Sequence, residues 1–192
     1  DSSTSRGLGD VYKRQRYVFR QMTLDQIRRI NSLNKVGVFV NASVEEVLHL
    51  VDECRLQMVQ LHGDESPAYC SRIADYVSVV KAFRVSENDS IPWMTRPFMD
   101  VCDMFLFDTM GAGYGGTGKK FDWAVLSQEE VGKPYFLSGG IEAGDEEKLR
   151  EFAAQPAAKA LFAVDINSKF EVSPGIKDID RVGDFVKKIK SH

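Results

Sequence analysis

Asp108 is the residue of this chain that could most readily do chemistry. It follows the apolar run 105–107 and precedes a glycine-rich stretch, which is the pattern of a buried strand that ends in a functional loop. In α/β folds the ligands bind at the carboxyl ends of the strands, where a carboxyl group can exchange a proton with a substrate. Asp108 is therefore our candidate general acid or base, with a role as a cap or turn residue as the alternative.

The loop that follows Asp108 has the composition of a phosphate site. Residues 111–118 contain five glycines and one threonine. Such a backbone can approach a ligand closely and direct several N–H groups at an anion. We expect Gly115, Gly116 and Thr117 to bind phosphate, although the loop could also be a mobile connector. A GxGxxG pattern lies within it, but no acidic residue at the expected distance supports a dinucleotide site.

Two further strand ends have the same character. One is Ser138-Gly139-Gly140, and the other is the polar stretch 165–171, which contains Asn167 and Ser168. Many barrels bind phosphate on the loops after their seventh and eighth strands, beside a helix N-terminus. Each loop alone could be an ordinary helix-entry turn. Their combination predicts a phosphate site.

Other polar residues allow several interpretations. His62 directly follows a strand and could contact a carboxylate or aromatic substrate, but a lone histidine is more often structural. Lys81 lies within a strand and could point into a barrel and pair with a carboxylate. Asp165 ends the last strand, where a structural or phosphate-orienting role is expected. Cys54 and Cys70 are expected to be small buried residues on helices, and Cys102 to face the end of the barrel away from the site.

Strand and helix patterns alternate from residue 16 onward, which predicts parallel strands joined by crossover helices. The fold is either a (β/α)₈ barrel or an open doubly wound sheet, and the polar residues after nearly every strand favour the barrel. The expected strands are 35–40, 57–61, 78–85, about 100–107, 133–137 and 160–164. The expected helices are 23–33, one starting near 41–43, 67–75, 145–155 and 176–190.

Composition limits the function classes. The 192 residues are 43% hydrophobic with a net charge of −3, which suits one globular domain and gives no basic surface for nucleic acid. No stretch reaches the length of a membrane span, and the three cysteines suggest neither a metal site nor a disulfide framework. We expect a cytoplasmic protein whose single domain covers residues 16–192. Residues 1–15 resemble a foreign, disordered head.

Five stretches of the chain resemble phosphoribosylanthranilate isomerase, a (β/α)₈ barrel family of tryptophan biosynthesis. They are VGVFVN at 36–41, QLHGDE at 60–65, YGGTGKKFDW after the Asp108 strand, LSGGI at 137–141 and SPGIKD at 173–178. The resemblance implies an aldose-ketose isomerase that performs an Amadori rearrangement of N-(5-phosphoribosyl)anthranilate without a metal or cofactor. It also implies a phosphosugar as the only partner, and a monomer or homodimer.

The resemblance also assigns roles to single residues. Asp108 matches the general acid that opens the sugar ring, and Arg16 matches the arginine that holds the anthranilate carboxylate. Gly116, Gly139, Gly140 and Ser168 fall in the phosphate loops. His62 gains a role on the substrate side.

One family feature does not occur in this sequence. The family begins with a strand that ends in K-[IV]-C-G, whose cysteine is the general base, and no such motif is present. We therefore expect an incomplete barrel that lacks the first strand, first helix and second strand, with little isomerase activity. The alternatives are a catalytically silent phosphosugar-binding module, or another phosphate-binding barrel such as an indole-glycerol-phosphate synthase.

Overall fold

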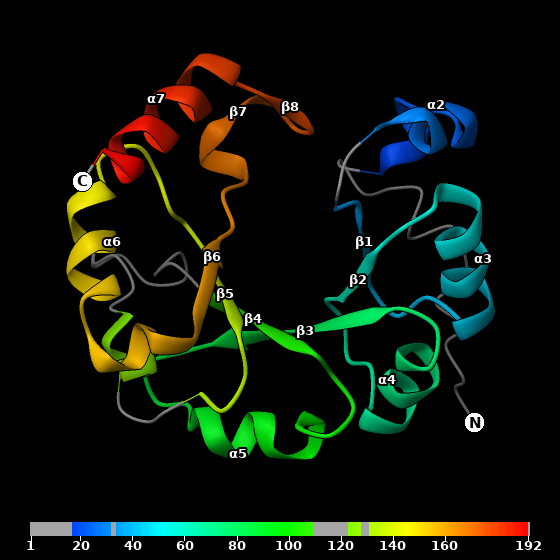
Figure 1. Ribbon diagram of the computed structural model, residues 1–192, viewed down its shortest axis with the longest axis horizontal. Helices are drawn as coiled ribbons and strands as arrows, with labels where there is room; N and C mark the ends of the chain where they lie inside the picture. The colour runs from blue at the N-terminus through cyan, green and yellow to red at the C-terminus, as the bar shows by residue number, and fades with distance from the viewer. Residues whose placement is uncertain (1–16, 32–33, 110–122, 128–130, 192) are drawn as a thin grey trace, which may run out of the picture.

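The computed structural model describes residues 17–31, 34–109, 123–127 and 131–191. Six parallel strands form one sheet in the order in which they occur in the sequence. The sheet curves into an arc with helices on its outer side, and the arc opens between β1 and β6 (Figure 1). This arrangement confirms the prediction of an incomplete (β/α)₈ barrel. The strands are β1 (Val36–Phe39), β2 (Met58–Leu61), β3 (Ser78–Val85), β4 (Met104–Thr109), β5 (Tyr135–Ser138) and β6 (Leu161–Val164).

Most helices begin at a polar side chain that caps their first free N–H groups. Thr23 and Gln26 form a reciprocal capping box on α2, and Ser43 and Ser66 each accept an N–H three residues later on α3 and α4. The caps set where each crossover helix starts after its strand or loop. The helices are α2 (Leu24–Arg29), α3 (Val44–Cys54), α4 (Pro67–Ala74), α5 (Ile91–Thr95), α6 (Glu146–Ala153) and α7 (Ile179–Lys190).

The side chains of the strands alternate between two apolar layers. Phe105, Phe107 and Tyr135 belong to the large cluster between the sheet and the outer helices. Val80, Ala82, Met104 and Leu106 face the other way and form a smaller cluster on the concave side. On the edge strands this concave side is exposed: Val38 on β1 is 61% exposed and Phe162 on β6 is 64% exposed. The edges of the arc thus present apolar surface that an additional pair of strands would cover.

The predicted boundaries were wrong at two helices. The closing helix begins at Ile179 rather than at Ile176, because residues 176–177 form strand β8 (Ile176–Lys177), which pairs with β7 (Glu171–Ser173). Gly175 makes the turn between them with a φ of 85°, and Asp178 then caps α7. The first predicted helix ends at Arg29, because Ile30 has extended backbone. The short helix α5 was not predicted.

No helix in the described ranges is both long and apolar enough to cross a membrane.

Candidate active site

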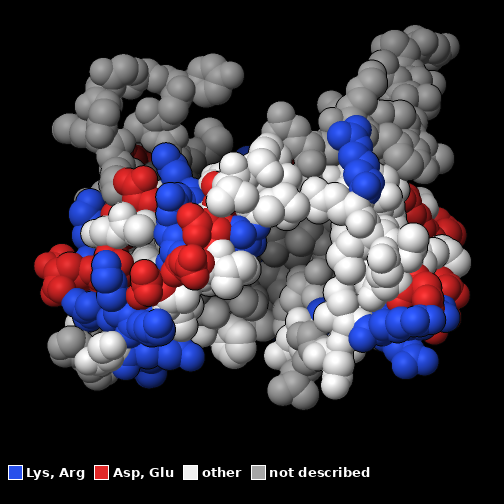
Figure 2. Space-filling view, turned by 90° about the horizontal axis from the view of Figure 1, so that it is seen from above, with Lys and Arg blue, Asp and Glu red and all other residues white. Residues whose placement is uncertain are grey.

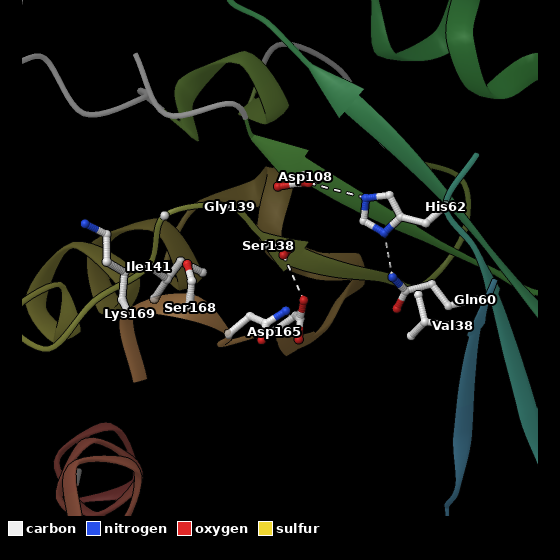
Figure 3. Close-up of a pocket in the computed structure, with 12 residues that line it drawn as sticks. Val38, Gln60, His62, Asp108, Ser138, Gly139, Ile141, Asp165, Ser168 and Lys169 are labelled. Atoms are coloured by element: carbon white, nitrogen blue, oxygen red, sulfur yellow. Dashed lines mark hydrogen bonds and ion pairs between the residues drawn. The ribbon is translucent and has the colours of Figure 1, made fainter. Parts of the chain in front are cut away.

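A cavity of about 270 Å³ lies at the carboxyl ends of the strands. It collects predicted residues from four separate parts of the chain (Figure 3). Parallel pairing explains why they meet, since Asp108 on β4 stands directly beside Ser138 on β5. The residues discussed from the sequence that line it are His62, Asp108, Ser138, Gly139, Gly140, Asp165, Asn167 and Ser168.

Three side chains form a row along one wall of the cavity, joined by one hydrogen bond and one ion-pair contact. His62 Nε2 lies 3.4 Å from Asp108 Oδ2, and His62 Nδ1 lies 2.8 Å from Gln60 Nε2. Figure 3 shows the imidazole between the carboxylate and the amide. Because an amide nitrogen can only donate, this arrangement gives His62 Nδ1 as the acceptor and Nε2–H as the group that faces Asp108. His62 is 22% exposed and Asp108 32%, so a ligand in the cavity can reach both.

The opposite wall has the properties of an anion site. Gly139 and Gly140 have φ values of 102° and 63°, a backbone that glycine adopts without strain. Ser138 Oγ donates to Asp165 Oδ2 at 2.8 Å, which ties the ends of β5 and β6 together. Ser168 and Lys169 follow from the loop after β6 and face the same cavity (Figure 3). Glycine backbone, a hydroxyl and a lysine are groups that bind phosphate.

Four predicted site residues lie outside the described residues. These are Arg16, Gly115, Gly116 and Thr117. Their proposed contacts with carboxylate and phosphate therefore stay predictions.

The expectation for Lys81 was half right. Lys81 does pair with a carboxylate, since its Nζ lies 3.1 Å from Glu65 Oε2. It does not point into the barrel: Lys81 pairs in register with Leu61 and Phe105, and both belong to the layer under the outer helices. Side-chain alternation along β3 places Ala82, and not Lys81, on the concave side.

The three cysteines lie away from the cavity. Cys54 and Cys70 are buried on α3 and α4 as expected, and Cys102 is buried just before β4. Burial raises the pKa of the Cys54 thiol. The hydrogen bond with Cys70, together with burial, raises the pKa of Cys102. None of these thiols lines the candidate site.

Sequence reasoning missed four residues that line the cavity, namely Val38, Gln60, Ile141 and Lys169. Gln60 carried a usable signal, because a polar residue inside an apolar strand has to face a polar partner or a cavity. Val38 carried none, since its apolar side chain looks like that of any strand residue. Lys169 immediately follows the predicted Ser168, so the loop was recognised but not its cation.

The fold and the cavity define an incomplete (β/α)₈ barrel whose candidate site lies at the carboxyl ends of its strands, with an aspartate and a histidine facing two phosphate-type loops. The sequence profile of N-(5'phosphoribosyl)anthranilate (PRA) isomerase matches residues 2–188. The chain belongs to this family of isomerases of tryptophan biosynthesis.

Individual relatives agree with the family assignment. An N-(5'-phosphoribosyl)anthranilate isomerase from Parabacteroides distasonis is 39% identical over 91% of this chain and 78% of its own length. The crystal structure of phosphoribosyl anthranilate isomerase from Thermotoga maritima matches with a TM-score of 0.74 and 32% identity, over 94% of this chain and 85% of that one. A further crystal structure of the isomerase, in complex with reduced 1-(o-carboxyphenylamino)-1-deoxyribulose 5-phosphate, matches with a TM-score of 0.69 and 29% identity, over 94% and 84%.

Proposed function

We propose that this chain binds N-(5'-phosphoribosyl)anthranilate and carries the acid half of its Amadori rearrangement to 1-(2-carboxyphenylamino)-1-deoxyribulose 5-phosphate. The observation that carries the proposal is the cavity itself, in which Asp108 and His62 face the loops of residues 138–140 and 167–169. A substrate with a phosphate at one end and a sugar ring in the middle fits this order of groups.

Asp108 acts as the general acid. In its protonated form it donates a proton to the ring oxygen of the furanose, the bond from C1 to that oxygen breaks, and a protonated imine forms. Loss of the C2 proton to a base then gives an enolamine, which takes up a proton at C1 and loses the proton of its 2-hydroxyl, so that C2 becomes the ketone. No atom is gained or lost overall, so the reaction needs only proton transfers.

The phosphate is held by the two loops across the cavity. Ser138, Gly139 and Gly140 provide one half, and Asn167 and Ser168 provide the other, with Lys169 as a nearby cation. Gly115, Gly116 and Thr117 add a third phosphate contact, and Arg16 holds the anthranilate carboxylate. These roles follow from the resemblance and from the residue chemistry.

We further propose that the 192-residue chain turns over slowly, because none of the cysteines, all of which the structure describes, stands in the position of the family's base. All three of its cysteines are buried and none lines the cavity. Loss of a positioned acid or base commonly lowers the rate by about 10²–10⁴-fold. A catalytically silent phosphosugar-binding protein is the second candidate, and the same observation favours it. In either case the chain works in the cytoplasm, as a monomer or homodimer.

The test compares three proteins in an isomerase assay: the chain itself, a version whose first fifteen residues are replaced by a family-type Lys-Ile-Cys-Gly strand unit, and that version with Asp108→Asn. We expect turnover at the family's usual level only in the second protein. Binding of reduced 1-(o-carboxyphenylamino)-1-deoxyribulose 5-phosphate to the unaltered chain, measured by calorimetry, separates a binding protein from one without the site. Full family-level activity in the unaltered chain would contradict the assignment of the base. If none of the three proteins binds the analogue, the proposal that N-(5'-phosphoribosyl)anthranilate is the substrate is refuted.

A further inference from the structure

His62 lies on a short segment whose backbone is held from both sides by a buried ion pair. Lys81 Nζ contacts the carbonyl oxygens of Leu61, at 3.2 Å, and Gly63, at 2.8 Å. These are the two residues that flank His62. Lys81 Nζ also contacts the Glu65 carboxylate. The ammonium group therefore joins the backbone beside His62 to an acidic side chain.

Glu65 binds the same segment through its N–H groups. Its carboxylate accepts the N–H of Gly63 at 2.9 Å and the N–H of Asn41 at 2.8 Å. Asn41 closes the network, because its Oδ1 accepts the N–H of Asp64 at 2.7 Å. We name Asn41, Glu65 and Lys81 the clasp. It links the ends of β1 and β2 to the middle of β3, and these three strands are neighbours in the sheet (Figure 1).

The Lys81–Glu65 ion pair of the clasp is closed to water, and the turn at Gly63 has no room for a larger side chain. Lys81 is 4% exposed and Glu65 1%. A Cβ on Gly63 would lie 2.3 Å from Asn41 Oδ1 and 2.7 Å from Glu65 Oε1, so only glycine fits there. Asn41 itself has a φ of 54°, an uncommon backbone that its surroundings must hold. On the face seen in Figure 2, most of the charged side chains lie on the two outer flanks of the central hollow.

Such a pair adds little stability in general, because the loss of hydration offsets the attraction between the charges. Its usual benefit is a unique geometry. Here the backbone so fixed carries the imidazole that faces Asp108 at 3.4 Å. We infer that the clasp positions His62 against Asp108 for ligand binding, and that Lys81 and Glu65 are positioning residues of the site. This inference rests on the proposed function.

The experiment is a double-mutant cycle on the full chain with reduced 1-(o-carboxyphenylamino)-1-deoxyribulose 5-phosphate as the probe. The clasp variant is Lys81→Met with Glu65→Gln, which leaves no unpaired buried charge. Its partner in the cycle is His62→Ala, and the triple variant completes it. The matched control is Arg72→Met with Glu45→Gln, which removes an ion pair of 3.3 Å on the surface.

We expect His62→Ala and the clasp variant each to weaken analogue binding by about tenfold, the value of one hydrogen bond to a charged group. The triple variant should bind no more weakly than His62→Ala, because the clasp acts through His62. The control should bind like the unaltered chain. If the two tenfold losses multiply, so that the triple variant binds about a hundredfold more weakly, the inference is overturned. Unchanged binding in the clasp variant would also overturn it.

A second measurement tests the positioning role of the clasp without relying on the proposed substrate. The ring signals of His62 and His49 are recorded by NMR without any ligand, with His62→Ala used for assignment. We expect the His62 signal to move or broaden in the clasp variant, whereas His49 on α3 stays unchanged. If the unaltered chain binds no analogue, the proposed function fails but this result still decides the clasp. If the clasp variant does not fold, Glu65→Gln alone takes its place, and an unmoved His62 signal there overturns the positioning role.

Discussion

The tripeptide Gly-Asp-Glu occurs twice in this chain, at 63–65 after β2 and at 144–146 after β5. The local hydrogen bond is the same in both. Gly63 donates its N–H to Glu65 Oε2 at 2.9 Å, and Gly144 donates to Glu146 Oε2 at 2.8 Å. The lysine that faces each carboxylate differs: Lys81 is 4% exposed, whereas Lys188 is 63% exposed. The same local hydrogen bond therefore occurs in two different settings, according to what the fold places against it.

The difference also separates the two walls of the candidate site. The wall of His62 is held by the buried Lys81–Glu65 pair and its hydrogen bonds to the backbone. On the other wall, Gly140 has no atom within 4 Å of the position of a Cβ. We interpret the first wall as the one that fixes the proton-transfer groups, and the second as the one that adapts to a phosphate.

Removing the lysine from each pair should give the largest difference. We expect Lys81→Met to lower the free energy of unfolding by about 3–5 kcal/mol, because it leaves the Glu65 carboxylate buried without a partner. Lys188→Met should cost below about 1 kcal/mol, because water replaces the lost contact. Urea denaturation of both variants at neutral pH measures this. Equal costs would mean that the two tripeptides are energetically alike.

Adding a methyl group to each glycine should give a smaller difference. Gly63→Ala places Cβ against Asn41 and Glu65, and we expect a loss of about 3 kcal/mol from overpacking. Gly144→Ala meets no atom within 4 Å, but its φ of 105° strains an alanine, which should cost about 1–2 kcal/mol. Thermal unfolding compares the two. Only Gly63→Ala should also weaken analogue binding, and a loss of binding in Gly144→Ala would contradict the division between the walls.

The order of strands and the position of the cavity could be predicted from the sequence, because both follow from local patterns. Apolar runs followed by polar residues marked each strand end, and parallel pairing then brought Asp108 beside Ser138. The hairpin β7–β8 could not be predicted in this way. Residues 176–177 fit the start of a helix, and only the turn at Gly175 and the cap at Asp178 move the helix start to Ile179.

The clasp was beyond sequence reasoning for a different reason. Glu65 and Lys81 are 16 residues apart, and neither spacing nor composition shows that they meet. A lysine within an apolar strand could face either layer, and the prediction chose the wrong one. The direction of Lys81 depends on the register of β3 against β2 and β4, which is a property of the whole sheet.

The smallest expected effect is the pH dependence of the stability that Glu146 contributes. The hydrogen bonds from backbone N–H groups, with Lys188 nearby, hold the pKa of this carboxyl below its ordinary value of 4.5. The stability contributed by Glu146 is therefore fully present above the pKa of the unfolded chain, and it is lost as the pH falls through the lower folded value. We expect Glu146→Gln to cost below about 1 kcal/mol at pH 7, because its charged partner Lys188 is 63% exposed to water.

Urea denaturation of Glu146→Gln and of the unaltered chain between pH 7 and pH 3 checks this prediction. The difference between their free energies of unfolding should be constant down to about pH 5 and should shrink toward zero below it. Asp184→Asn, which removes an exposed carboxylate of α7, is denatured over the same pH range as the control. A difference that grew on acidification would mean that the folded state favours the protonated carboxyl. In that case Gly144 and Lys188 would not stabilise the charge of Glu146. The two tripeptides would then share a sequence but not a stabilised carboxylate.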